Sequence, residues 1–302
     1  MGREVPLTDD DLEAQAQRLE ASGQYRVLRR IKPNFVELEA PTRSLRRGLY
    51  VDVETTGLDP IKDEIIELAM VPFTYSLDGE ILAVGHPYQG LREPSQPIPE
   101  EITQLTGIDD AMVAGRSIDA NEVANFVAPC ALVVAHNAAF DRRFLERLCE
   151  TFTTKAWACS MSQVDWARED IQGLRLSHIA TALGLFYDAH RAADDCLAGV
   201  EVLRRPLASG AGSGFAQLLN AARQATWRIW AENSPFELKD VLKARGYRWN
   251  ADLSLGPKCW HIDVAEDQKD AELTFLKSEI YQREVELRTK RVDAYDRFSE
   301  RV

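Results

Sequence analysis

Residues 48–57 read Gly-Leu-Tyr-Val-Asp-Val-Glu-Thr-Thr-Gly. The apolar run is typical of a buried strand, and its last three residues are typical of the turn that ends one. Alternate residues of a strand point to the same face, so the carboxylates of Asp52 and Glu54 project together. Taken alone, such a pair is better explained as a strand end whose acids meet solvent.

The residues that follow alternate between strand and helix patterns. A hairpin through Asp78-Gly79 joins the next two strands. Three meandering strands followed by alternating strands and helices predict an α/β sheet with helices on its faces. The further strands are expected at residues 64–75, 81–86 and 131–135, and the helices at 120–128, 139–148, 177–183 and 194–203.

Composition divides the chain into four segments. We expect a small N-terminal extension at residues 1–46 and an α/β domain at 47–205. A Gly/Ser-rich linker should follow at 206–216, and a small α+β C-terminal module with tryptophans at 217–302. The extension is predicted to hold a helix capped by Thr8 and then a short hairpin within residues 25–38. Beyond the linker, helices are predicted at 215–232 and, as one long helix, at 267–291.

The formal charge of −12 lies entirely in residues 47–205, which carry 13 basic and 25 acidic side chains. Such acidity would ordinarily argue against a nucleic-acid partner, because phosphates attract basic surfaces. No apolar stretch is long enough to span a membrane, and we expect a cytoplasmic protein with no membrane contact. The five cysteines are widely spaced, which favours reduced thiols over a zinc site.

Two further motifs add acids to the pair on the first strand. A buried strand ends at Ala135 and leads through a turn to Asp141 at a helix start. His190 stands on a loop just before Asp194 and Asp195, at another helix start. Each motif alone is explained by helix capping or by the helix dipole.

Together, however, four carboxylates at one place repel one another and require a counter-charge. Two divalent cations supply it, and hard oxygen ligands favour Mg²⁺ or Mn²⁺. Such a pair of ions suits an in-line displacement at phosphorus. A nearby histidine can take the proton from the attacking water, because its pKa lies near neutrality.

The order of these motifs resembles the DEDDh family of 3′–5′ exonucleases, over about residues 47–205. Residues 98–108 are also similar to the family's segment between its first and second motifs. The resemblance implies a ribonuclease H-like fold with a mixed five-stranded sheet. It implies that two Mg²⁺ or Mn²⁺ ions are held by four carboxylates, those of Asp52, Glu54, Asp141 and Asp195. It also implies that His190 is the general base.

Family spacing places the last aspartate five residues after the histidine, so we choose Asp195 over Asp194. Thr55, Leu58 and Leu105 stand where family members contact the terminal nucleotide. Asn137 is grouped with these substrate-binding positions, although bracing the turn before Asp141 is its preferred role.

The implied reaction removes nucleoside 5′-monophosphates one at a time from a single-stranded or frayed 3′ end of DNA, with RNA as an alternative. This reaction would serve in DNA repair, proofreading or end trimming. Two alternatives remain: a proofreading subunit bound to a DNA polymerase subunit, and a non-catalytic nucleic-acid-binding protein on the same fold. In the C-terminal module, Trp249 and Trp260 stand among basic residues, a composition that holds single strands but also fits a small aromatic core.

Overall fold

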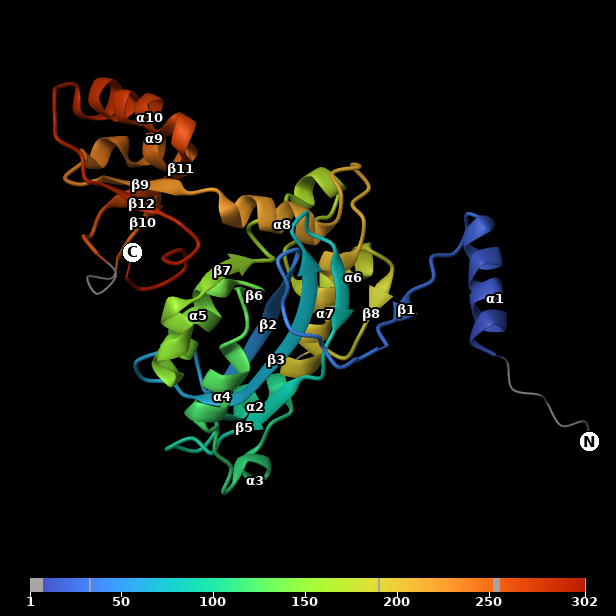
Figure 1. Ribbon diagram of the computed structural model, residues 1–302. Coiled ribbons are helices and arrows are strands. Elements are labelled where there is room, and N and C mark those ends of the chain that lie inside the picture. The colour runs from blue at the N-terminus through green and yellow to red at the C-terminus, as the bar shows by residue number, and fades with distance from the viewer. Residues whose placement is uncertain (1–7, 33, 190, 252–255, 302) are drawn as a thin grey trace, which may run out of the picture.

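The computed structural model describes residues 8–32, 34–189, 191–251 and 256–301, so the expected general base His190 lies outside the described residues. A main body is built on a six-stranded sheet, and a smaller C-terminal body on a four-stranded one (Figure 1). Helix α1 (Asp9–Ala21) stands away from the main body (Figure 1). Among the described residues, no helix is both long and apolar enough to cross a membrane.

The main sheet is centred on β2 (Leu45–Thr55). Its strand order is β4-β3-β2-β6-β7, and β5 pairs with the other end of β3. β2 runs antiparallel to β3 and parallel to β6, which is parallel to β7. The predicted mixed sheet of five strands is therefore present, with β5 as a sixth. The remaining strands are β3 (Ile65–Ser76), β4 (Ile81–Val84), β5 (Tyr88–Leu91), β6 (Leu132–Ala135) and β7 (Ala156–Cys159).

Both faces of β2 are covered by helices, and this explains its apolar sequence. Leu49 and Val51 point into an apolar cluster that includes α4 and α5. Tyr50 points into the other cluster, with α6, α7 and α8. Because Asp52 and Glu54 share the face of Tyr50, they lie on the side that α7 covers. The helices of the main body are α2 (Glu100–Thr106), α3 (Asp110–Val113), α4 (Ala120–Val127), α5 (Ala138–Leu148), α6 (Leu176–Ala182), α7 (Ala192–Arg204) and α8 (Gly214–Arg223).

The N-terminal extension docks on the main body. Thr8 caps α1 as predicted, and its side chain accepts a hydrogen bond from the backbone N–H of Asp11. The prediction of a hairpin within residues 25–38 is wrong, as far as the structure describes this segment. Instead β1 (Arg29–Arg30) pairs in parallel with β8 (Leu185–Phe186). An isolated two-stranded hairpin is marginally stable, whereas β8 belongs to a body that is already packed.

The segment between the two bodies is shorter than the predicted linker. Pro206 and Ser213 form an isolated bridge, and α8 starts at the next residue. Phe215 is fully buried in the same apolar cluster as α7, so α8 packs as part of the main body. We therefore place the start of the C-terminal module at Thr226 and the end of the main body at Arg223.

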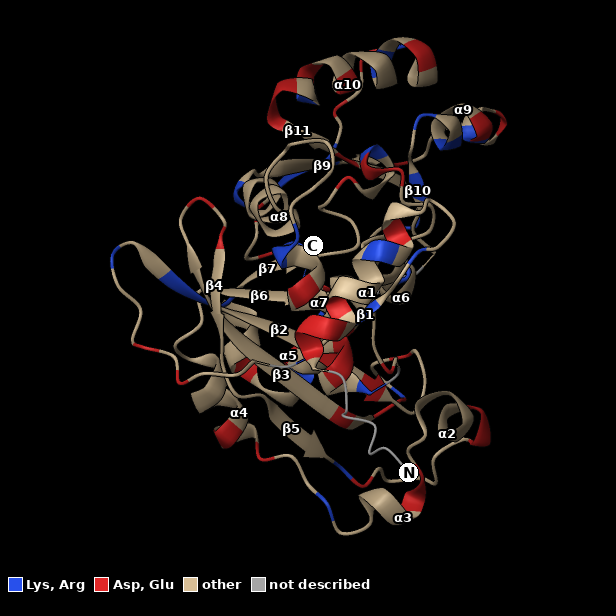
Figure 2. Cartoon of the chain, turned by 90° about the vertical axis from the view of Figure 1, so that its right-hand side faces the viewer, with Lys and Arg blue, Asp and Glu red and all other residues tan. Residues whose placement is uncertain are grey.

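The C-terminal module (residues 226–301) forms an antiparallel sheet of order β10-β11-β9-β12. Its strands and helices are β9 (Thr226–Ala231), α9 (Lys239–Ala244), β10 (Arg248–Trp249), β11 (Trp260–Ala265), α10 (Lys269–Phe275) and β12 (Thr289–Val292). Acidic and basic residues are interspersed over it (Figure 2).

Two helix predictions in this region are wrong. The helix expected at 215–232 ends with α8, because residues 226–231 form β9 in the middle of the module's sheet. The helix expected at 267–291 continues past α10 only as a π-helical turn, Leu276–Tyr281. Gln282 then adopts a left-handed conformation (φ 51°), and the chain returns as β12 to pair with β9. In both segments, strand pairing within the sheet overrides local helical propensity.

After β12 the C-terminal tail (residues 293–301) returns to the main body and contacts α5. The guanidinium of Arg142, which is fully buried, donates hydrogen bonds to the carbonyl oxygens of Tyr295 and Arg297, each at 2.6 Å. Arg142 directly follows Asp141, so the tail ties the C-terminal module to the helix that carries one of the predicted acids.

Candidate active site

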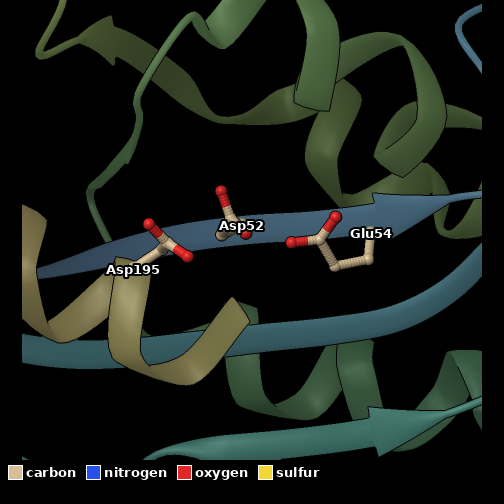
Figure 3. A group of neighbouring side chains, drawn as sticks. All are labelled: Asp52, Glu54 and Asp195. Atoms are coloured by element: carbon tan, nitrogen blue, oxygen red, sulfur yellow. The ribbon is translucent and has the colours of Figure 1, made fainter. Parts of the chain in front are cut away.

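Three of the four predicted acids meet on one face of the main sheet. Asp52 and Glu54 come from β2, and Asp195 comes from the first turn of α7 (Figure 3). Their carboxylate oxygens lie within 4.8 Å of one another. Asp194 is exposed, so the structure brings Asp195 rather than its neighbour into this cluster.

Asp141 is the fourth acid, and it is almost completely buried at the start of α5. Its charge raises the pKa of Asp52, so the two carboxyl groups are electrostatically linked. The preceding turn depends on Asn137, whose backbone is left-handed (φ 70°), a conformation that asparagine tolerates better than most residues. Asp141 is therefore positioned by a strand, a tight turn and the start of a helix.

Burial and mutual repulsion weaken the acidity of these carboxyl groups. Burial, and then the charges of Asp141 and Asp195, raise the pKa of Asp52 well above its ordinary value. Burial and the charge of Asp195 raise the pKa of Glu54 to about 7. Burial raises the pKa of Asp141 to about 8, although backbone hydrogen bonds oppose the shift. Each group therefore retains a proton near neutral pH unless a cation takes its place.

The side chains present fit a divalent metal. The cluster consists of carboxylate oxygens, the hard donors that Mg²⁺ and Mn²⁺ prefer. Arg191 lowers the pKa of Glu54, but its guanidinium pairs with Glu67 at 3.4 Å. One guanidinium cannot balance four carboxylates, so this arrangement stabilises bound cations.

Glu67 is a functional candidate that the sequence interpretation missed. It lies opposite Glu54 in the register of β2 and β3 and is only 2% exposed. Its carboxylate accepts hydrogen bonds from the backbone N–H of Ala192, at 3.3 Å, and from the Arg191 side chain. Those two residues directly follow His190 in the chain. The available signal was a single acid within the apolar run of residues 65–71.

The position of Asp195 is set by two further residues that were not predicted. The Tyr187 hydroxyl donates a hydrogen bond to Asp195 Oδ1 at 2.8 Å. Gly199 lets α7 approach β2 closely, because a Cβ there would lie 2.0 Å from Cζ of Tyr50. Glycine at this position therefore allows the first turn of α7 to reach Asp52.

The predicted substrate-binding residues divide into two groups. Leu58, which is 79% exposed, and Asn137 both line one large cleft, four residues after Glu54 and four residues before Asp141 respectively. Thr55 is buried, and its hydroxyl donates to the carbonyl oxygen of Gly57 at 2.6 Å, so it shapes the turn after β2. Leu105 is exposed on α2 and lies outside that cleft as the described residues define it.

Comparison with known families identifies the main body. A family model described as an exonuclease, RNase_T, matches residues 49–203, about half of the chain. The chain belongs to the RNase_T exonuclease family. The resemblance to DEDD-type 3′–5′ exonucleases is thereby confirmed: the main body is an exonuclease domain with a ribonuclease H-like α/β fold, and its acidic cluster fits divalent metal ions.

Curated relatives match about half of the chain. The PolC-type DNA polymerase III of Thermotoga petrophila is 32% identical over 172 residues, covering 52% of this chain and 12% of that polymerase. The corresponding polymerase of Clostridium perfringens is 33% identical over 159 residues, covering 51% of this chain and 11% of the polymerase. The match thus spans only about a tenth of the length of these relatives.

Solved structures are similar at lower identity. Exonuclease X in complex with 5′ overhanging duplex DNA is 24% identical with a TM-score of 0.43, covering 58% of this chain and 98% of that one. E. coli exonuclease I in complex with a dA16 oligonucleotide is 13% identical with a TM-score of 0.47, covering 76% and 68%.

Proposed function

We propose that this exonuclease hydrolyses the 3′-terminal phosphodiester of single-stranded or frayed DNA and releases nucleoside 5′-monophosphates. The observation that carries the proposal is the meeting of Asp52, Glu54 and Asp195 within 4.8 Å, with buried Asp141 coupled to Asp52. These four residues would hold two Mg²⁺ or Mn²⁺ ions. When bound, the ions would stabilise the attacking and leaving oxygens of an in-line displacement.

The protein's own residues supply the rest of the reaction. His190 would accept the proton of the attacking water as the new P–O bond forms and the bond to the 3′ oxygen of the penultimate nucleotide breaks. That oxygen takes a proton from solvent and becomes the new 3′ hydroxyl, and the proton on His190 passes to solvent before the next cycle. Glu67 anchors Arg191 and Ala192, the residues next to this histidine. Tyr187 holds Asp195 in place.

Two observations support DNA as the substrate and a pocket that accepts one nucleotide. The relatives that match about half of this chain are DNA polymerases. Leu58 projects from the turn just after Glu54, where an exposed apolar side chain can pack on a terminal base. RNA is the alternative substrate.

The same relatives favour a second candidate, a proofreading subunit that acts with a DNA polymerase. We prefer an enzyme that works with its own C-terminal module, because the tail binds that module directly to α5. Stable co-purification of the protein with a polymerase subunit from its host would support the second candidate instead.

The test uses 5′-labelled oligonucleotides of DNA and RNA with Mg²⁺, Mn²⁺ or EDTA. Wild type should give a descending ladder from the 3′ end of DNA with metal and none with EDTA. Asp52→Ala and Asp195→Ala should abolish the ladder, whereas Asp194→Ala is the matched control one residue away and should retain it. No ladder from wild type under any condition would favour a non-catalytic nucleic-acid-binding protein; full activity in Asp52→Ala would refute the proposed site.

A further inference from the structure

A large cleft lies between the main body and the C-terminal module, lined by residues of both. Its volume is about 1110 Å³, larger than the roughly 300–1,000 Å³ of pockets for small ligands. Leu58 lines it four residues after Glu54, and Asn137 and Phe140 line it from the turn that carries Asp141. The cleft therefore extends from the catalytic end of the main body and has room for an extended ligand.

The opposite wall is one face of the module's sheet. Side chains alternate along the strands, and the other face packs on an apolar core that contains Ile229 and Val264. The cleft face presents Trp230, Arg248 and His261, which are neighbours in the strand register. A sheet with one apolar and one polar face normally turns the polar face to water. Here the polar face is turned to the cleft and so to the approach to the active site.

The charge of the cleft differs from that of the main body. Its lining contains four arginines, Arg143, Arg228, Arg248 and Arg297, and three acids, Asp165, Asp263 and Glu300. The lining is thus slightly basic in a chain of net charge −12. Arginine is well suited to bind phosphate, so this lining suits a phosphate backbone better than the acidic surface of the main body does.

Within the described chain, Arg248 and His261 each leave a polar group in the cleft without a hydrogen-bond or ion-pair partner. Arg248 is exposed and has no carboxylate within ion-pair distance among the described residues. Nδ1 of His261 is buried, and within the described chain it makes no hydrogen bond. By contrast, Arg228 is held by a bidentate pair with Asp263, at 2.8 and 2.9 Å. Arg248 and His261 are therefore the groups available to a ligand.

Hydrogen bonds between the C-terminal tail and α5 join the two bodies that flank the cleft. Arg142 joins the tail to α5, and Ser299 donates a hydrogen bond to Glu146 on the same helix at 2.8 Å. Phe298 of that tail and Phe140 of α5 both line the cleft, which places aromatic rings on its walls beside the arginines. Aromatic rings among basic side chains are the combination that holds single strands without regard to sequence.

We propose that this cleft binds the single-stranded part of the substrate upstream of its 3′ end, with Arg248 as a phosphate contact. The inference rests on the proposed function, because it takes the carboxylate cluster as the place where the 3′ end is cut. It assigns to the C-terminal module a substrate-binding role that the family match at residues 49–203 does not cover.

The first test measures binding without turnover. Fluorescence anisotropy of 5′-labelled oligo(dT) is recorded in EDTA for full-length wild type, Arg248→Ala and Lys243→Ala. Lys243 is the matched control, because it is an exposed cation on α9 and does not line the cleft. Arg248→Ala should weaken binding of a strand of about 16 nucleotides by about tenfold and lower the salt slope by about 0.7 to 1. Lys243→Ala should match wild type.

The second test separates this inference from the proposed function. Steady-state hydrolysis is measured on strands of about 4 and about 16 nucleotides. Arg248→Ala should raise KM more than it lowers kcat, and more for the longer strand, whereas Asp52→Ala should remove turnover at both lengths. The charge reversal Arg248→Glu should exaggerate the loss, with Tm measured to verify folding.

The inference would be overturned if wild type and both Arg248 variants bound the long strand with equal affinity. The cleft would then be better explained as a binding surface for a protein. A loss independent of strand length would overturn the inference too. An enzyme that cuts nothing but loses affinity in Arg248→Ala would refute the proposed function while supporting the cleft.

Discussion

Stability should depend on pH through the buried carboxyl groups, and Glu54 offers the most tractable case. Its pKa is raised from 4.5 to about 7 by burial and by the charge of Asp195. The folded state therefore holds the proton more tightly than the unfolded chain. This contribution is fully present below about pH 4.5 and is lost as the pH rises through about 7.

The size of this contribution to the unfolding free energy follows from the pKa shift of Glu54. A pKa raised from 4.5 to about 7 corresponds to about 3 kcal/mol of unfolding free energy. For a chain of this size that is about 6–12 °C in Tm. Asp141, with its pKa raised to about 8, acts in the same direction. The lowered pKa of His136 acts in the opposite direction below about pH 6.5, so a variant is needed to isolate Glu54.

The assay is thermal melting in EDTA from about pH 5 to about pH 8, for wild type and Glu54→Gln. The glutamine is neutral throughout, so the variant should lose less Tm than wild type as the pH rises. Saturating Mn²⁺ should remove the decline in wild type, because the cation replaces the proton; at 100 times its Kd a ligand adds about 2.7 kcal/mol. A wild-type Tm that falls no more steeply than that of Glu54→Gln would refute the reasoning.

Three further substitutions test residues that position the site or anchor the C-terminal tail beside it. Glu67→Ala should lower kcat by about 10- to 100-fold by releasing Arg191 and Ala192, the residues beside the proposed general base. Glu67→Gln should rescue part of the loss by restoring an oxygen acceptor, and equal kcat values for Glu67→Ala and wild type would contradict this role. Tyr187→Phe should weaken the apparent Mn²⁺ affinity in activity titrations by about tenfold through Asp195, and an unchanged titration would argue against that role. Arg142→Ala should cost about 3–5 kcal/mol of unfolding free energy, because it leaves a cavity and removes the hydrogen bonds of a buried guanidinium to Glu146 and to two carbonyl oxygens of the tail; denaturant unfolding measures it, and a loss below about 1 kcal/mol would contradict the tail's anchoring role.

The part of the site that could be predicted from the sequence follows from short-range rules. Strand periodicity places Asp52 and Glu54 on one face, and strand-to-helix turns place Asp141 and Asp195 at helix starts. Each rule spans only a few residues, so it holds whatever the rest of the chain does. The structure gathers Asp52, Glu54 and Asp195 as the motif order predicted.

The parts that were missed depend on contacts between distant segments. Glu67 becomes relevant only through the register that sets it opposite Glu54. Tyr187 is relevant only because its hydroxyl reaches Asp195. Likewise residues 226–231 are compatible with a helix on local propensity, and only pairing with β11 and β12 on both sides makes them a strand.

The tryptophans show the same division between local and distant information. Trp230 is buried on the cleft side of the module, while Trp249 is 53% exposed and packs edge-on against Trp260. The composition alone favoured a tryptophan core. The core cluster of the module is instead mostly aliphatic, with Ile229 and Leu242 among its buried members, and Trp227 and Trp260 at its margin.

The central claim is that the four carboxylates bind divalent cations for hydrolysis, and calorimetric titration with Mn²⁺ tests it most directly. Measured above about pH 8, which exceeds the raised pKa of Glu54 and reaches that of Asp141, wild type should bind two ions per chain. Asp52→Asn keeps the shape of the side chain and removes its charge, and it should lose at least one of the two ions. Identical binding of Mn²⁺ by wild type and Asp52→Asn would contradict the account.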